Sequence, residues 1–188
     1  MKEIARSAFF KLKQIRIAFS CKDTDFQMYL YTTYVRPKLE YNTCIWSPQL
    51  LKDIDKIESV QIRFTKSLPG TSSLNYLDCL ALTKLKSLEE RRISFDQILV
   101  YKIIHGLIDL KFEDFFSFNR NVTRGHSYKL NIQYARVNYR KFFFANRVVH
   151  IWNNLPSDLV EKTSLGAFKK GINSLDLSRH CRGRAFMT

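Results

Sequence analysis

Apolar side chains recur every three or four residues over much of the chain, and this spacing predicts a mainly α-helical fold. Over residues 2–19, for example, Ile4, Ala8, Leu12, Ile15 and Phe19 fall on one face of a helix. Segments with helical spacing cover residues 2–19, 24–33, 51–68, 74–82, 87–107, 142–155 and 164–172.

Residues that begin or end helices lie at the borders of these segments. Asp23 or Thr24 can cap the second helix, and Ser164 can cap the last one. Ser87 and Glu90 form a capping box, with Ser87 at the cap and Glu90 reaching back. Pro37 lacks an amide hydrogen, so the second helix is expected to stop or kink there.

Helical spacing disappears over residues 117–133. Residues 127–133 alternate weakly, which predicts a strand that pairs with residues 137–141. We therefore expect at most one short β-hairpin, and a loose basic tail from Ser178 onward. Two regions follow from this pattern: residues 1–116 form a helical bundle, and residues 117–188 form a basic, aromatic-rich extension with short helices.

Positive charge accumulates toward the C-terminus. Residues 119–188 hold 13 Lys and Arg against 3 Asp and Glu, whereas residues 1–118 hold 18 against 14. Residues 115–157 contain no Asp or Glu, and basic side chains are interleaved with aromatic rings along this stretch. This combination suits a nucleic acid, which offers phosphates and flat bases. The alternative is that the rings form a core and the charges a solvated rim.

The cysteines and the apolar runs indicate in which cellular compartment the protein is expected. The four cysteines lack the spacing of a zinc site, which indicates free thiols in a reducing compartment. No apolar run approaches the ~20 residues that cross a bilayer. We therefore expect an intracellular, soluble protein of the nucleus or cytoplasm, with no membrane partner.

The candidate nucleic-acid ligands are basic residues from both regions. Lys52, Lys56 and Arg63 lie within about 40° of one another on a helix, either as a phosphate-binding row or as a solvated face. Arg36 either faces a duplex or pairs with Glu40. The remaining candidates are Arg124, Arg136, Arg140, Lys141 and Arg147.

Single residues that could carry chemistry have structural alternatives. Trp46 and Trp152 could stack on bases, although their apolar surroundings favour core positions. His126 lacks a nearby nucleophile or orienting acid, so a hydrogen bond that fixes a loop is the preferred interpretation.

Several short motifs, in this order and spacing, resemble the region C-terminal to the palm in reverse transcriptases of jockey-like non-LTR (LINE-type) retrotransposons. They are YVRPKLEY at 34–41, IWSP at 45–48, KDIDKIESVQ at 52–61, LPG at 68–70, LEERR at 88–92, YKIIHG at 101–106, TRGHS at 123–127 and NRVVHIWNNLP at 146–156. The resemblance covers about residues 5–173. It implies a helical thumb and a C-terminal extension that contact template RNA or an RNA–DNA hybrid.

The resemblance does not imply that this chain polymerises DNA. The family's palm aspartates, which hold Mg²⁺ in the parent polymerase, have no counterpart here. Asp53 and Asp55 lie two residues apart on a helix and point about 200° away from each other. We therefore expect no catalytic residue, no metal site and no cofactor.

The leading interpretation is a non-catalytic fragment of a reverse transcriptase that binds RNA or RNA–DNA hybrid through its backbone. One alternative is a helical scaffold that binds a protein partner, such as the missing fingers–palm portion of the polymerase. The other is a decayed element copy with no selected role.

Overall fold

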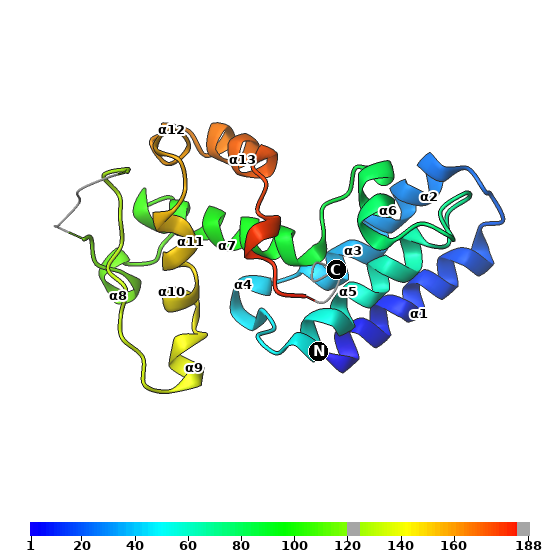
Figure 1. Ribbon diagram of the computed structural model, residues 1–188, viewed down its shortest axis with the longest axis horizontal. Coiled ribbons are helices and arrows are strands. Elements are labelled where there is room, and N and C mark those ends of the chain that lie inside the picture. The colour runs from blue at the N-terminus through cyan, green and yellow to red at the C-terminus, as the bar shows by residue number, and fades with distance from the viewer. Residues whose placement is uncertain (120–124, 184–188) are drawn as a thin grey trace. The chain divides into compact units, whose positions relative to one another are not determined.

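The computed structural model describes residues 1–119 and 125–183 (Figure 1). It is mainly α-helical, which confirms the fold class expected from the apolar spacing. Its contacts divide the chain into two compact units. The first unit comprises residues 1–92 and the described residues from Cys181, and the second comprises residues 93–180. This division lies at residues 92/93, whereas the border expected at residues 116/117 followed the loss of helical spacing along the sequence.

The first unit is a set of helices around one apolar core. α1 packs against α5 and α3, and the ring of Tyr31 stacks on Phe64 with 4.1 Å between centroids. Apolar side chains from five helical segments fill the core, including Ala8, Val35 and Val60. The helices are α1 (Lys2–Ala18), α2 (Thr24–Leu30), the π-helix η1 (Tyr31–Val35), α3 (Arg36–Glu40), α4 (Thr43–Trp46), α5 (Leu51–Thr65), α6 (Tyr76–Thr83) and the start of α7 (Leu88–Ile104).

The chain changes helix type directly before Pro37, where the sequence predicted a stop or a kink. α2 continues into η1, and Pro37 is the second residue of α3. A proline is tolerated in a first helical turn, because the amide hydrogen that it lacks has no acceptor within that turn. A π-helical turn followed by a new α-helix therefore lies where the sequence predicted a stop or a kink.

The caps predicted at Asp23 and Ser87 are present. Asp23 accepts a hydrogen bond from the amide of Phe26 at 2.7 Å, and Ser87 accepts one from Glu90 at 3.0 Å. The carboxylate of Glu90 forms an ion pair with Lys86 at 2.7 Å. The first amides of α7 also donate to Glu58 on α5, a contact that the sequence did not predict.

The second unit gathers short helices around the rings of Trp152 and Phe168, both fully buried. Tyr101 stacks on Phe168 with 4.3 Å between centroids, and its hydroxyl donates to the carbonyl of Lys162 at 2.6 Å. Ser164 caps the last α-helix through the amide of Ala167, as predicted. Besides the continuation of α7, the helices are α8 (Phe112–Phe115), α9 (Asn138–Lys141), α10 (Phe144–Arg147), α11 (Val149–Asn153), α12 (Ser157–Val160), α13 (Leu165–Ser174) and the 3-10 turn η2 (Ser178–His180).

Two local predictions were wrong. The partner expected for the strand at residues 127–133 is helical, because residues 138–141 form α9. Leu130 instead forms an isolated antiparallel bridge with Phe118. The tail from Ser178 is not loose as far as Gly183, because the amides of Arg182 and Gly183 donate to the carboxylate of Glu89 at 3.0 and 2.9 Å.

Candidate nucleic-acid interface

The chain around Leu130 is held by side chains of α11. The side-chain amide of Asn153 accepts from the Leu130 N–H and donates to the Leu130 carbonyl, both at 2.8 Å. It thus supplies the same pair of hydrogen bonds that a neighbouring strand would supply. The Trp152 indole also donates to the carbonyl of Tyr128 at 2.8 Å. The backbone that leads into residue 132 is therefore anchored.

The imidazole of His126 adds to this anchor. Its Nε2 lies 3.1 Å from the carbonyl oxygen of Trp152, so Nε2 carries the proton and donates. Burial lowers the pKa of His126, which favours the neutral ring. The loop-fixing role predicted for His126 is confirmed, and so is the core position predicted for Trp152. Trp46, in the first unit, is half-buried, and its indole donates to the carbonyl of Tyr41.

The other end of this surface is fixed by the turn between α9 and α10. The side-chain amide of Asn146 donates to the carbonyl of Arg140 at 2.7 Å. Phe144, the first residue of α10, is buried and contacts the ring of Phe116 edge-on. The backbone of α9 is therefore tied to a helix whose aromatic side chain lies in the core.

Between these two anchors, residues 132–143 form a surface that we term the basic–aromatic segment. Tyr134 is 84% exposed, Tyr139 is 82% exposed and Phe143 is 56% exposed. The side chains of Arg136, Arg140 and Lys141 are also exposed, and the segment contains no acidic residue. Rings that are this exposed to solvent are not part of the apolar core. Three candidate cations thus share one short stretch of chain with three solvent-facing rings.

The aromatic residues of 115–157 therefore divide into two groups. Phe116, Phe144 and Trp152 are core residues, as the structural alternative held. Tyr134, Tyr139 and Phe143 face solvent, as the nucleic-acid interpretation requires. Spacing alone did not separate the groups, because helical periodicity is absent from most of this stretch.

Arg147 belongs to the interior of the second unit rather than to this surface. Its guanidinium donates to both carboxylate oxygens of Asp96 on α7, at 3.0 Å each. The two side chains are only 12% and 9% exposed. A bidentate pair of this kind is specific in its geometry and strong. Arg147 was a candidate phosphate ligand, but two of its N–H groups already donate to Asp96.

Arg36, in the first unit, lies beside an acidic partner. Its Nε is 3.8 Å from Glu40, and the same carboxylate accepts two hydrogen bonds from Arg91. Burial lowers the pKa of Arg36, and the positive charge of Arg91 acts in the same direction. Of the two alternatives for Arg36, these contacts match the ion pair with Glu40.

The row on α5 lies in solvent. Lys52, Lys56 and Arg63 are all exposed, whereas Ile57 and Val60 on the same helix are buried. The side of the helix predicted for these three cations is therefore correct. Their position suits either a phosphate contact or a plain solvated face. Arg124 lies outside the described residues.

Neither a metal site nor a membrane-crossing helix is found in the part of the chain that the structure describes. Within it, no group of three or more His, Cys, Asp or Glu side chains could hold a metal ion. None of the helices described has both the length and the apolar character that crossing a bilayer requires.

Comparison of the chain with protein-family models, with curated proteins and with solved structures finds no match.

Proposed function

We propose that this chain binds the sugar–phosphate backbone of RNA or of an RNA–DNA hybrid, as a non-catalytic C-terminal part of a reverse transcriptase of the jockey-like type. The family assignment rests on the ordered motifs in the sequence. One structural observation carries the binding proposal: residues 132–143 expose three cations and three aromatic rings without an acidic side chain.

The physical basis is electrostatic attraction combined with stacking. Arg136, Arg140 and Lys141 can each neutralise a phosphate and release condensed counterions, which makes affinity depend steeply on salt. Tyr134 and Tyr139 can stack on unpaired bases, a contact worth roughly 1–3 kcal/mol per base that tolerates any sequence. The expected binding is therefore salt-sensitive and has little sequence preference.

The first unit contributes a separate row of cations. Lys52, Lys56 and Arg63 lie on one exposed face of α5, where they can follow a phosphate backbone. α5 also provides much of the buried core through Ile57, Val60 and Phe64, so this face is held by a packed helix. We assign the bracing of a duplex to this row and sequence-tolerant contact to the basic–aromatic segment.

A titration of the full 188-residue chain against labelled RNA and RNA–DNA hybrid tests the proposal. Fluorescence anisotropy should report binding at low salt, with affinity falling linearly on a logarithmic plot against salt concentration. A nucleotide-incorporation assay on the same samples should give no product, because the parent family's Mg²⁺-holding palm aspartates have no counterpart here. Absence of binding at low salt would remove the proposed function.

A second candidate, a scaffold that binds a protein, is supported by exposed apolar side chains of the first unit. Tyr41, just before α4, is 75% exposed, and Ile45 on α4 is 79% exposed. Apolar surface of this kind is typical of a protein-binding face when it is contiguous. Sedimentation over a range of concentrations would detect self-association. Nucleic-acid binding without self-association would favour the first candidate.

A further inference from the structure

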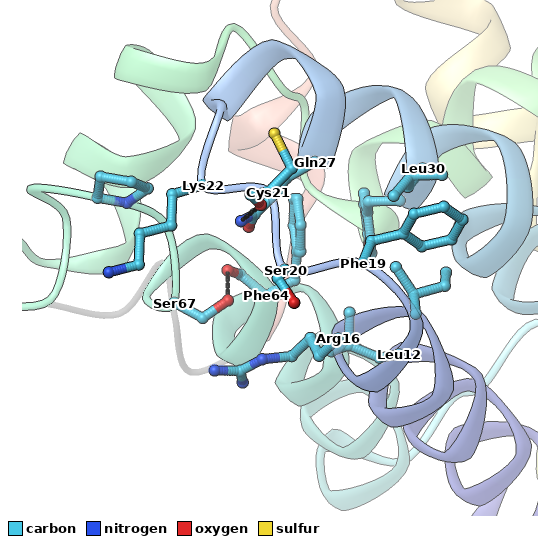
Figure 2. A pocket seen from close by; sticks show the side chains of 13 residues that line it. Leu12, Arg16, Phe19, Ser20, Cys21, Lys22, Gln27, Leu30, Phe64 and Ser67 are labelled. Atoms are coloured by element: carbon cyan, nitrogen blue, oxygen red, sulfur yellow. Dashed lines mark hydrogen bonds between the residues drawn. The ribbon is translucent and has the colours of Figure 1, made fainter.

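The first unit contains a cavity of about 480 Å³ at the C-terminal end of α1 (Figure 2). The end of α1, the loop from Phe19 to Lys22, α2 with η1, and the chain at the end of α5 surround it. Leu12, Leu30 and Phe64 are buried residues of its wall, and Phe19 is partly exposed there. A cavity of this size lies in the range of small-molecule sites.

Two cations lie at one side of this apolar cavity. In Figure 2 the charged ends of Arg16 and Lys22 point to one side of the view, whereas Leu12, Phe19 and Leu30 lie at the other. Both cations are exposed, and none of the described lining residues is acidic. The cavity thus has an apolar end and a positively charged end.

Two uncharged polar side chains of the wall, Gln27 and Ser67, are already engaged in hydrogen bonds. Gln27 donates to the carbonyl of Cys21 at 2.9 Å, and the hydroxyl of Ser67 donates to the carbonyl of Phe64 at 2.7 Å (Figure 2). A ligand with several polar edges, such as a nucleobase, would find few free partners in this wall, and each unpaired buried edge would weaken binding. A ligand with an apolar body and a single anionic group leaves none unpaired.

We propose that this cavity binds an amphipathic carboxylate, with an unbranched aliphatic body against Leu12, Leu30 and Phe64 and the carboxylate between Arg16 and Lys22. The apolar body gains from leaving water, and the carboxylate gains charge-assisted hydrogen bonds at the mouth. The site is separate from the basic–aromatic segment, and it does not depend on the proposed binding of nucleic acid.

Calorimetric titrations with hexanoate, octanoate and octanol, all below their micelle concentrations, test this chemistry. Each added methylene that is buried should tighten binding about threefold to fourfold, so octanoate should bind roughly tenfold more tightly than hexanoate. Octanol, which lacks the charge, should bind at least about tenfold more weakly than octanoate. Equal binding of octanol and octanoate, or tighter binding of uridine monophosphate than of octanoate, would overturn the proposal.

A charge-matched pair of variants locates the site. The double variant Arg16→Gln, Lys22→Gln should bind octanoate about tenfold more weakly than wild type. The double variant Lys2→Gln, Lys13→Gln changes two cations of α1 that do not line the cavity, and it should bind octanoate with unchanged affinity. Cys21 is an exposed thiol in the cavity wall and gives an independent readout. Octanoate should slow alkylation of Cys21 by iodoacetamide without slowing that of Cys44. Saturable binding that protects both cysteines equally, or that is lost equally in both variant pairs, would contradict the location.

Discussion

The carboxylate of Glu58, on α5, accepts a hydrogen bond from the backbone N–H of Leu88 at 3.0 Å. Its second oxygen accepts from the amide of Glu89 at 3.3 Å, and the hydroxyl of Tyr76 also donates to Glu58. Glu58 is almost fully buried, and from 30 residues away it accepts from the first two amides of α7, while Ser87 accepts from the next one, that of Glu90.

We expect Glu58→Ala to destabilise the protein strongly. The substitution leaves the two amides of α7 and the Tyr76 hydroxyl without this acceptor, and each buried polar group that loses its partner costs about 1–3 kcal/mol. The free energy of unfolding, measured with urea, should therefore fall by at least ~3 kcal/mol. Lys56→Ala, on the exposed face of the same helix, should change it by less than ~0.5 kcal/mol. Similar effects of the two substitutions would contradict the role of Glu58.

The contribution of Glu58 to the free energy of unfolding should depend on pH, because its carboxyl group can take up a proton. Burial raises the pKa of Glu58 above its ordinary value of 4.5, while the Tyr76 hydrogen bond and the charge of Arg92 oppose the rise. The carboxyl group of Glu58 therefore binds its proton more tightly in the folded state than in the unfolded chain. Stabilisation from a raised pKa is complete below the unfolded pKa and is lost as the pH rises through the folded pKa.

The advantage of wild type over Glu58→Gln should accordingly shrink as the pH rises from roughly 4 toward 7, because the glutamine does not titrate. Urea unfolding of both proteins at each pH measures this difference in the free energy of unfolding. An advantage that grows with pH would mean that the folded protein lowers the pKa of Glu58.

Arg147 should act on stability and not on nucleic-acid binding. Arg147→Ala removes two hydrogen bonds from the buried carboxylate of Asp96, and breaking a buried pair in this way costs roughly 3–5 kcal/mol. Chemical unfolding should detect the loss. Under conditions where the variant remains folded, its salt dependence of RNA binding should match that of wild type. Reduced RNA binding by a folded variant of unchanged stability would restore Arg147 as a phosphate ligand.

The reactivity of the Cys181 thiol should show whether the amides of Arg182 and Gly183 are bound to Glu89. Burial raises the pKa of Cys181, and the negative charge of Glu89 raises it further. Because the thiolate is the reactive form, Cys181 should be alkylated at least about tenfold more slowly than the exposed Cys21. Glu89→Ala removes the acceptor of the Arg182 and Gly183 amides and also removes the negative charge. It should therefore speed the alkylation of Cys181 but not that of Cys21. Mass spectrometry of the modified peptides gives both rates, and equal rates in wild type would contradict the closed contact.

The local parts of the fold could be predicted from the sequence, because their causes lie within a few residues. The apolar faces of α1, α5 and α7 follow from helical spacing, and the caps at Asp23, Ser87 and Ser164 follow from side chains next to the amides that they bind.

Contacts between distant residues could not be predicted in this way. Glu58 and Leu88 are 30 positions apart, and Asp96 and Arg147 are 51 apart. The backbone N–H and C=O of Leu130 bond to the side chain of Asn153, a contact that no alternation pattern reveals. For the same reason, the sequence identified the basic and aromatic stretch but not which of its rings are exposed.

The most direct test of nucleic-acid binding by residues 132–143 compares two triple variants. One replaces Arg136, Arg140 and Lys141 with Gln, and the other replaces the exposed Lys162, Lys169 and Lys170 of the same unit with Gln. Both lose the same charge, so a general effect of net charge would be equal in the two. Anisotropy titrations of single-stranded RNA against salt measure how many phosphates each protein contacts.

If each of the three cations neutralises one phosphate, the first variant should have a log–log salt slope shallower by about 2, while the second keeps the wild-type slope. Wild-type slopes for both variants, or an equal change in both, would contradict binding through residues 132–143.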